Sequence, residues 1–140
     1  MSSGMASGVA VSCVAGMIGK ASFGAFGGSN CKLKLMSTAA SEGTDGTEIS
    51  GGSYPAGGIS NAVSTTFGAA SYSAGVASIT NSGTAFSQTG MPAATIISAS
   101  VWDTGGTPVR WWWGDVTSVT TNSGDTLTFA TSSVVLSLNV

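Results

Sequence analysis

The chain has 140 residues, enough for one domain with its own hydrophobic core, and it carries four basic and six acidic residues for a net charge of −2. About a quarter of the residues of a soluble domain are usually charged, so serine, threonine, asparagine and glycine must cover most of this surface. We expect such a surface to lie against other protein in an assembly, and the few basic residues argue against a nucleic-acid partner.

The sequence contains no histidine. Histidine is the commonest general base, the usual partner of a nucleophilic serine or cysteine, and a common zinc ligand. We therefore predict a non-enzymatic protein with no catalytic residue, no cofactor and no metal. The two cysteines, Cys13 and Cys31, do not make a disulfide framework, and they are either two small buried side chains or one bridge.

Residues 1–30 form an apolar lead rich in glycine and alanine. The stretch GVAVSCVAGMIG at 8–19 resembles the apolar region of a signal peptide, but no lysine or arginine precedes it. It is also too short to cross a bilayer, so we expect no membrane partner. Apolar residues near helical spacing predict a short helix at about 6–20, in a lead that is a helical or extended anchor or a cap on its own domain. The residues assigned to anchoring are Val9, Val11, Val14, Met17, Ile18, Phe23 and Phe26.

From residue 31 the hydrophobic period changes to two. In CKLKLM, Leu33 and Leu35 alternate with Lys32 and Lys34, which predicts a half-buried strand. A polar loop rich in turn-forming residues follows at 41–58. The acids of this loop recur every three residues but match no ordered calcium loop, so we favour a solvated loop over a calcium site; they are Glu42, Asp45 and Glu48.

The rest of the chain reads as short strands separated by glycine, asparagine and serine. NSG occurs at 81–83 and again at 122–124, each time between strand-like runs, which predicts two hairpin turns. Many short strands at this spacing predict an all-β domain over residues 31–140, either an antiparallel β-sandwich or a small jelly-roll-like barrel. The expected strands lie at about 59–67, 74–80, 84–89, 93–102, 108–113, 115–121, 125–131 and 134–140.

Three of the four tryptophans stand together in RWWWGDV at 110–116. In a regular strand Trp111 and Trp113 point to one face and Trp112 to the other. Burial of one indole stabilises a small domain by at most about 4–6 kcal/mol. We therefore assign Trp112 to the core and Trp111 and Trp113 to a contact with a neighbouring subunit, with a sugar-stacking surface as the alternative. The other residues assigned to the core are Leu127, Phe129, Leu136 and Leu138.

Residues 31–140 resemble a family of small tailed-bacteriophage virion proteins, variously called head decoration, head fibre or tail-fibre-like proteins. The resemblance rests on the order and spacing of several short pieces. These are GTEISGGSY at 46–54, TFGAAS at 66–71, MPAATI leading into VWD and a GG pair at 91–106, Trp112 with Gly114, the GDT turn at 124–126, and a closing LTF and LSL pair.

The resemblance implies a virion structural protein, oligomeric and without chemistry to perform. The leading expectation is a capsid decoration protein that binds and stabilises the assembled head, so that Trp111, Trp113 and the lead contact either another copy or the capsid. Its partners would be the major capsid protein and copies of itself, possibly as a trimer. It would lie on the surface of the phage particle after assembly in the reducing host cytoplasm, where a disulfide is less expected.

The alternative expectation is a tail-fibre or tail-tip module that binds a host-surface glycan. In that case exposed indoles would form a groove beside polar groups such as Asp103, Arg110 and Asp115. The sequence has no fibrous repeat and no coiled-coil heptad to serve as a shaft, which favours decoration.

Overall fold

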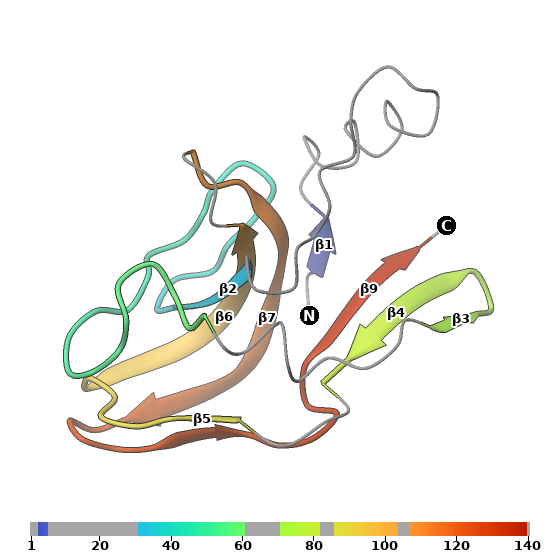
Figure 1. Ribbon diagram of the computed structural model, residues 1–140. Coiled ribbons are helices and arrows are strands. Elements are labelled where there is room, and N and C mark those ends of the chain that lie inside the picture. Colours follow the sequence, from blue (N-terminus) through green and yellow to red (C-terminus); the bar gives the residue numbers. More distant parts are fainter. Residues whose placement is uncertain (1–2, 6–30, 61–70, 82–85, 104–106, 140) are drawn as a thin grey trace.

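The computed structural model describes residues 3–5, 31–60, 71–81, 86–103 and 107–139. In these residues the chain is all-β and contains no helix (Figure 1). None of them therefore belongs to a helix long and apolar enough to cross a membrane. The strands are β1 (Ser3–Met5), β2 (Cys31–Met36), β3 (Ser71–Ser73), β4 (Val76–Thr80), β5 (Phe86–Gln88), β6 (Ala94–Asp103), β7 (Arg110–Thr121), β8 (Leu127–Phe129) and β9 (Val135–Asn139).

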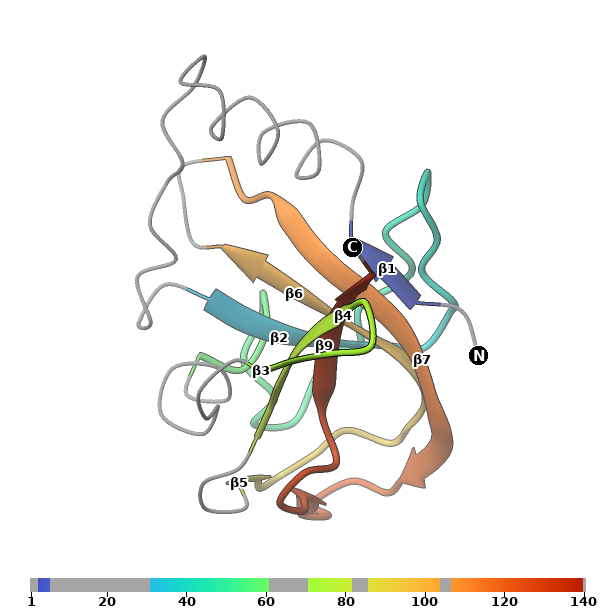
Figure 2. The ribbon, with the colours of Figure 1, turned by 90° about the vertical axis from the view of Figure 1, so that its right-hand side faces the viewer.

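The strands form three antiparallel sheets. The largest has the order β1-β7-β6-β2, a second has the order β3-β4-β9, and β5 pairs with β8. In the view of Figure 2 the second sheet lies in front of the first, and Leu136 of β9 packs against the core cluster of the first sheet. The described strands do not close into a barrel. The prediction of an all-β antiparallel fold is confirmed, and the arrangement is that of a β-sandwich. The predicted helix at 6–20 and the anchoring residues lie outside the described residues.

The strand β2 is paired along both of its edges. On one side it pairs with β6, from Cys31 opposite Asp103 to Met36 opposite Ser98. On the other side the backbone groups of Leu33 exchange hydrogen bonds with Ile59 at 3.1 and 2.8 Å, and the N–H of Ile49 donates to the carbonyl of Leu35 at 3.0 Å. The segment 47–59 therefore covers what would otherwise be an open sheet edge.

Gly58 allows this segment to approach so closely. Its φ is +100°, a conformation that residues with a side chain rarely adopt. A Cβ at this position would lie 2.8 Å from the carbonyl oxygen of Leu33. Glycine is thus required both by the backbone angle and by the contact with β2.

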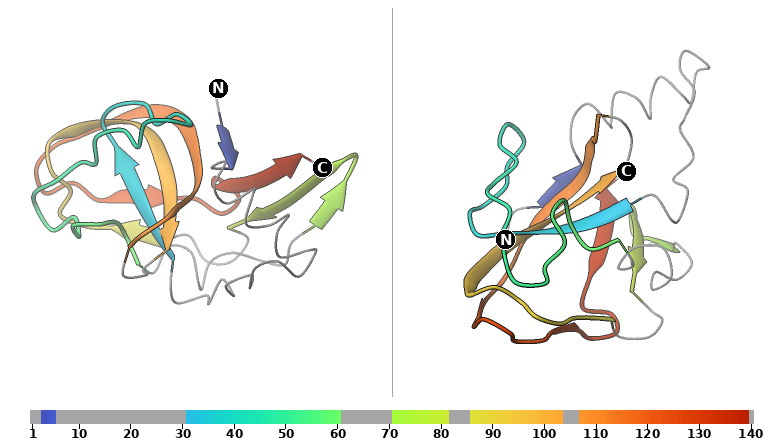
Figure 3. Two further views of the ribbon diagram at one scale, coloured as in Figure 1. Left: turned by 90° about the horizontal axis from the view of Figure 1, so that it is seen from above. Right: turned by 60° about the vertical axis from the view of Figure 1, so that its left-hand side comes forward.

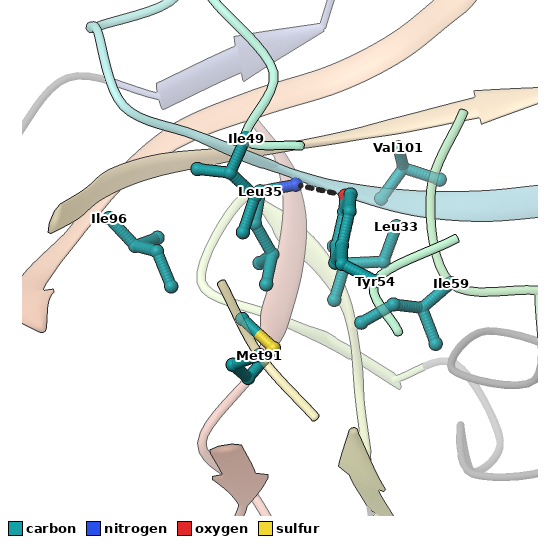
Figure 4. Packing of buried hydrophobic residues seen from close by; sticks show 8 residues of the cluster. All are labelled: Leu33, Leu35, Ile49, Tyr54, Ile59, Met91, Ile96 and Val101. Atoms are coloured by element: carbon teal, nitrogen blue, oxygen red, sulfur yellow. Dashed lines mark hydrogen bonds between the residues drawn. The ribbon is translucent and has the colours of Figure 1, made fainter. Parts of the chain in front are cut away.

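The buried core lies between the first sheet and the segments that cross it (Figure 4). Leu33, Leu35 and Val101 project from the sheet, and Tyr54 and Met91 meet them from the loops. The remaining members of the cluster are Ile49, Ile59 and Ile96. Trp112, Leu127, Phe129 and Leu136, which the sequence analysis assigned to the core, are partly buried and pack against this cluster. The side chain of Leu138 lies outside the described part.

Two irregularities bend β7 relative to β6. Val101 lies opposite Trp112 but Trp102 lies opposite Arg110, so Trp111 is an extra residue in β7. A second shift separates the pairs made by Ile96 and Ser98. Bulges of this kind increase local twist and re-aim side chains. The two strands expected at 108–113 and 115–121 are in fact one bent strand of 12 residues.

The prediction that both NSG segments form hairpin turns is wrong. The second segment does form a turn, in which the Asp125 side chain accepts a hydrogen bond from the N–H of Asn122 at 2.7 Å. It joins β7 to β8, however, and these strands belong to different sheets. Likewise β4 pairs with β9 and β5 with β8, so β4 and β5 do not form a hairpin around the first NSG.

A hairpin not expected from the sequence joins β3 to β4. Its two turn residues, Ala74 and Gly75, have φ values of 49° and 79°, the double positive φ of a type I′ turn. Seen from above in Figure 3, β3, β4 and the far end of β9 project away from the first sheet. We call the sheet of β3, β4 and β9 the wing.

Candidate functional site

Trp112 lies on the inner face of the first sheet. It is opposite Val101 in the register, and Val101 is buried in the core cluster. Residues directly opposite each other in an antiparallel pair share a face, so the indole of Trp112 points towards the core. It is half-buried and packs against the cluster.

Trp111 does not point to the face opposite Trp112, as strict alternation predicted. Its ring stacks on that of Trp112, with centroids 6.4 Å apart and an interplanar angle of 25°. The bulge in β7 explains the difference. Trp111 has no partner residue on β6, so its side chain does not follow the regular alternation between the two faces of the sheet. The Nε1–H of Trp111 donates to Oδ2 of Asp103 at 3.3 Å, which fixes the orientation of the indole.

Trp113 lies on the outer face of the sheet, opposite Ser100. The indole is half-buried, and its Nε1 is a buried atom with no hydrogen-bond acceptor among the described residues. The strand β1 runs alongside, with Gly4 opposite Trp113 and Met5 opposite Trp112. Thus Trp111 and Trp113, predicted to share one contact face, are placed differently by the bulge.

The loop 37–47 folds onto the outer face and is held there by Arg110. Its guanidinium donates to the carbonyl oxygens of Thr44 at 2.8 Å, Ser41 at 2.6 Å and Glu42 at 3.1 Å. It also lies 3.3 Å from the carboxylate of Asp45. Arg110 is only 6% exposed, so its guanidinium is buried against the loop that it binds. It is not available to a saccharide, contrary to its place in the glycan-binding alternative.

A second group of polar contacts joins the loop 47–59 to β2. The hydroxyl of Tyr54 accepts a hydrogen bond from the N–H of Leu35 at 3.0 Å and donates to Oε1 of Glu48 at 3.2 Å. Burial, with the neighbouring carboxylate of Glu48, raises the pKa of Tyr54 well above its usual range. Lys34 lies 3.7 Å from Glu48 and 4.1 Å from the ring centre of Trp102, a cation–π distance.

An open cleft of about 620 Å³ separates the inner face of the first sheet from the segment 127–137. Its lining is mainly apolar and includes Ile96, Trp112, Phe129 and Leu136. Asp115 is the one charged residue among the lining residues. The cleft is therefore a space for apolar packing, and its lining does not bring together two titratable groups for acid–base chemistry.

The loop that carries the three acids is exposed at Glu42 and Asp45, and two of its acids also contact groups of the domain. Asp45 pairs with Arg110, and Glu48 contacts Lys34 and Tyr54. Among the described residues no three cysteines, aspartates or glutamates gather in a way that could hold a metal ion. The lead residues assigned to anchoring cannot be placed, because they lie outside the described part of the chain.

The wing carries exposed apolar residues that the sequence did not single out. Tyr72 is 69% exposed and Val135 is 54% exposed. All three residues of β3 are exposed, and every residue of β4 is half-buried. The sequence feature that could have indicated this surface is the absence of any charged residue from 71–80 and 135–139.

Comparison of this chain with protein-family models, with curated proteins and with solved structures found no match. The geometry of the molecule and the resemblance in its sequence therefore carry the functional argument.

Proposed function

We propose that this chain is a non-enzymatic structural protein of a bacteriophage particle, a decoration protein that binds the assembled capsid. The observation that carries the proposal is that several charged side chains of the protein bind other groups within the domain. Arg110 binds three backbone carbonyls, Lys34 lies between Glu48 and Trp102, and Asp103 binds Trp111. Because these charged groups are engaged within the domain, they favour recognition through apolar and backbone contacts.

The surface available for such recognition suits a large protein partner. Interfaces are enriched in tryptophan and tyrosine and depleted in charged residues at their centres. Trp111 and Trp113 are both half-buried, so each keeps part of its indole accessible to a partner. The resemblance to virion proteins supplies the identity of that partner, the major capsid protein.

We assign the capsid contact to Trp111 at the bulge of β7, and to Trp113 on the outer face of the same strand. Trp111 stacks on Trp112 and is fixed by Asp103, so its orientation is set before any partner binds. A rigid aromatic side chain loses little conformational entropy on binding. Because a decoration protein binds only the assembled lattice, its binding free energy adds to the stability of that lattice.

The test is co-sedimentation of the purified protein with heads of the encoding phage that lack it. We expect Trp111→Ala to remain folded, by circular dichroism, and to bind heads at least about tenfold more weakly, as loss of an interface anchor does. Val119→Ala, on the same strand, serves as the control because Val119 is exposed but not in the assigned contact. Trp112→Ala should instead destabilise the fold by about 3 kcal/mol.

Equal binding of heads by wild type, Trp111→Ala and Trp113→Ala would refute the assignment of the contact. Failure of the wild-type protein to bind the heads at all would refute the proposed function.

A further inference from the structure

The wing carries no charged residue, a property that it shares with the two-stranded sheet of β5 and β8. Its three strands consist of Ser, Tyr, Val, Ala, Ile, Thr, Leu and Asn. The charged residues of the described part all lie elsewhere, in β2, β6, β7 and the loops. The wing also projects from the body of the molecule (Figure 3), and every residue of β4 is only half-buried. Neither face of the wing is thus fully covered by the described residues.

In the first sheet β2, β6 and β7 each have a backbone partner on both sides among the described residues, whereas β3 at the edge of the wing, like the short β1, has a partner on one side. Backbone groups of segment 47–59 pair with β2, and β1 pairs with β7. Among the described residues β3 pairs with β4 alone. Edge strands of monomeric proteins usually carry lysine, proline or a bulge, each of which opposes pairing with another chain. The strand β3 has the sequence SYS and has none of these.

The apolar face of the wing runs from the core to this edge. Tyr72 lies opposite Ala77, and Ile79 lies opposite Leu136, so these four side chains share one face. Leu136 packs against the core cluster, Ala77 and Ile79 are half-buried, and Tyr72 is largely exposed. The face is therefore a continuation of the core that ends at an exposed aromatic side chain on an open edge.

We propose that a second copy of this chain docks on the wing, with β3 pairing antiparallel to β3 of the partner about a twofold axis. In this arrangement Tyr72 faces its own counterpart, since it is the central residue of a strand of three. Pairing a strand with itself places like side chains together, which is unfavourable for charges and favourable for tyrosine. A sheet of three strands that is half-exposed on both faces thereby becomes one continuous sheet of six.

This inference extends the proposed function. It rests on that function only for the claim that the dimer belongs to a phage particle. The copy-to-copy contact lies on the wing, whereas the capsid contact lies on β7. Dimer formation requires no capsid, so the two proposals can fail independently.

The experiment measures the solution mass of the full chain by light scattering. We expect the wild-type protein to have twice the chain mass of 13.7 kDa. Tyr72→Lys and Tyr72→Glu should each weaken self-association by about tenfold or more, because like charges face each other across the axis. An equal mixture of the two variants should recover the dimer, since opposite charges then meet. A structural role of Tyr72 alone would not produce this recovery.

Val109→Lys is the matched control, because Val109 is also exposed but lies outside the wing. It should keep the wild-type mass. A wild-type protein that is monomeric at its highest soluble concentration would overturn the inference. So would a Tyr72→Lys variant with unchanged mass, or a mixture of the lysine and glutamate variants that stays monomeric. A dimer that behaves as expected but does not bind heads would refute the proposed function and leave the wing contact standing.

Discussion

At the scale of single residues, Tyr54 shows how a polar group becomes part of the core. Its ring lies in the buried cluster, and its hydroxyl satisfies the N–H of Leu35, which no strand pairs (Figure 4). An unpaired buried N–H costs about 1–3 kcal/mol, so this hydroxyl replaces a missing hydrogen bond of the sheet edge. The motif GGSY drew attention to this position, but nothing in it indicated that the tyrosine hydroxyl would reach β2.

The raised pKa of Tyr54 predicts a loss of stability at alkaline pH. In the unfolded chain a tyrosine ionises near pH 10, while folded Tyr54 stays protonated above that pH. The unfolded state then binds fewer protons than the folded state, so the free energy of unfolding falls as pH rises past about 10. Below that pH the contribution is fully present.

Urea unfolding at about pH 9 and pH 11 measures this effect. Tyr54→Phe should lower the stability at pH 9 by about 1–3 kcal/mol, because the Leu35 N–H loses its acceptor. The variant should also lose less stability than the wild type between the two pH values. Equal losses in both proteins would contradict the role given to the buried hydroxyl.

At the scale of elements, local patterns predicted strands well and their irregularities poorly. The alternation of CKLKLM correctly predicted β2, because side chains of a strand alternate between its faces whatever its partner. The same rule failed at Trp111, because a bulge depends on how two strands pair. The sequence of one strand does not contain that information, so the face of Trp111 could not be predicted from RWWWGDV.

The contacts of Arg110 with the loop 37–47 are a second feature at the scale of elements. Arg110→Met should destabilise the protein by about 3 kcal/mol, since the three carbonyl groups that the buried guanidinium binds lose their donor and Asp45 loses its partner. Urea unfolding gives the loss, and limited proteolysis should show faster cleavage within the loop.

Lys34→Met is the control for removal of a positive charge from the same face. Lys34 is partly exposed, and its pairing with Glu48 and Trp102 should contribute no more than about 1 kcal/mol. If the two variants lost the same stability, Arg110 would not be holding the loop as described.

At the scale of the whole molecule, the all-β class followed from the many short strands, but the sheet order did not. The pairs β4 with β9 and β5 with β8 join segments far apart in the chain. Which strands pair depends on the packing of the whole domain. The NSG segments led to a wrong prediction because a turn sequence does not determine which strands pair. Core residues from loops, such as Ile49 and Met91, were missed because no periodic pattern marks them.

The domain as a whole presents two separate surfaces, one on β7 and one on the wing. In the proposed particle the first would contact the capsid and the second another copy. A ligand that binds only the assembled lattice stabilises it in proportion to its occupancy and affinity. Stabilisation of the capsid is the central claim of a decoration function, because a protein that bound the capsid without stabilising it would not have this function.

The most direct measurement is therefore the temperature at which phage heads lacking this protein release their DNA, with and without the purified chain at saturation. We predict a higher release temperature with the wild-type protein and little change with Trp111→Ala. The same release temperature with and without the bound wild-type protein would contradict a decoration function.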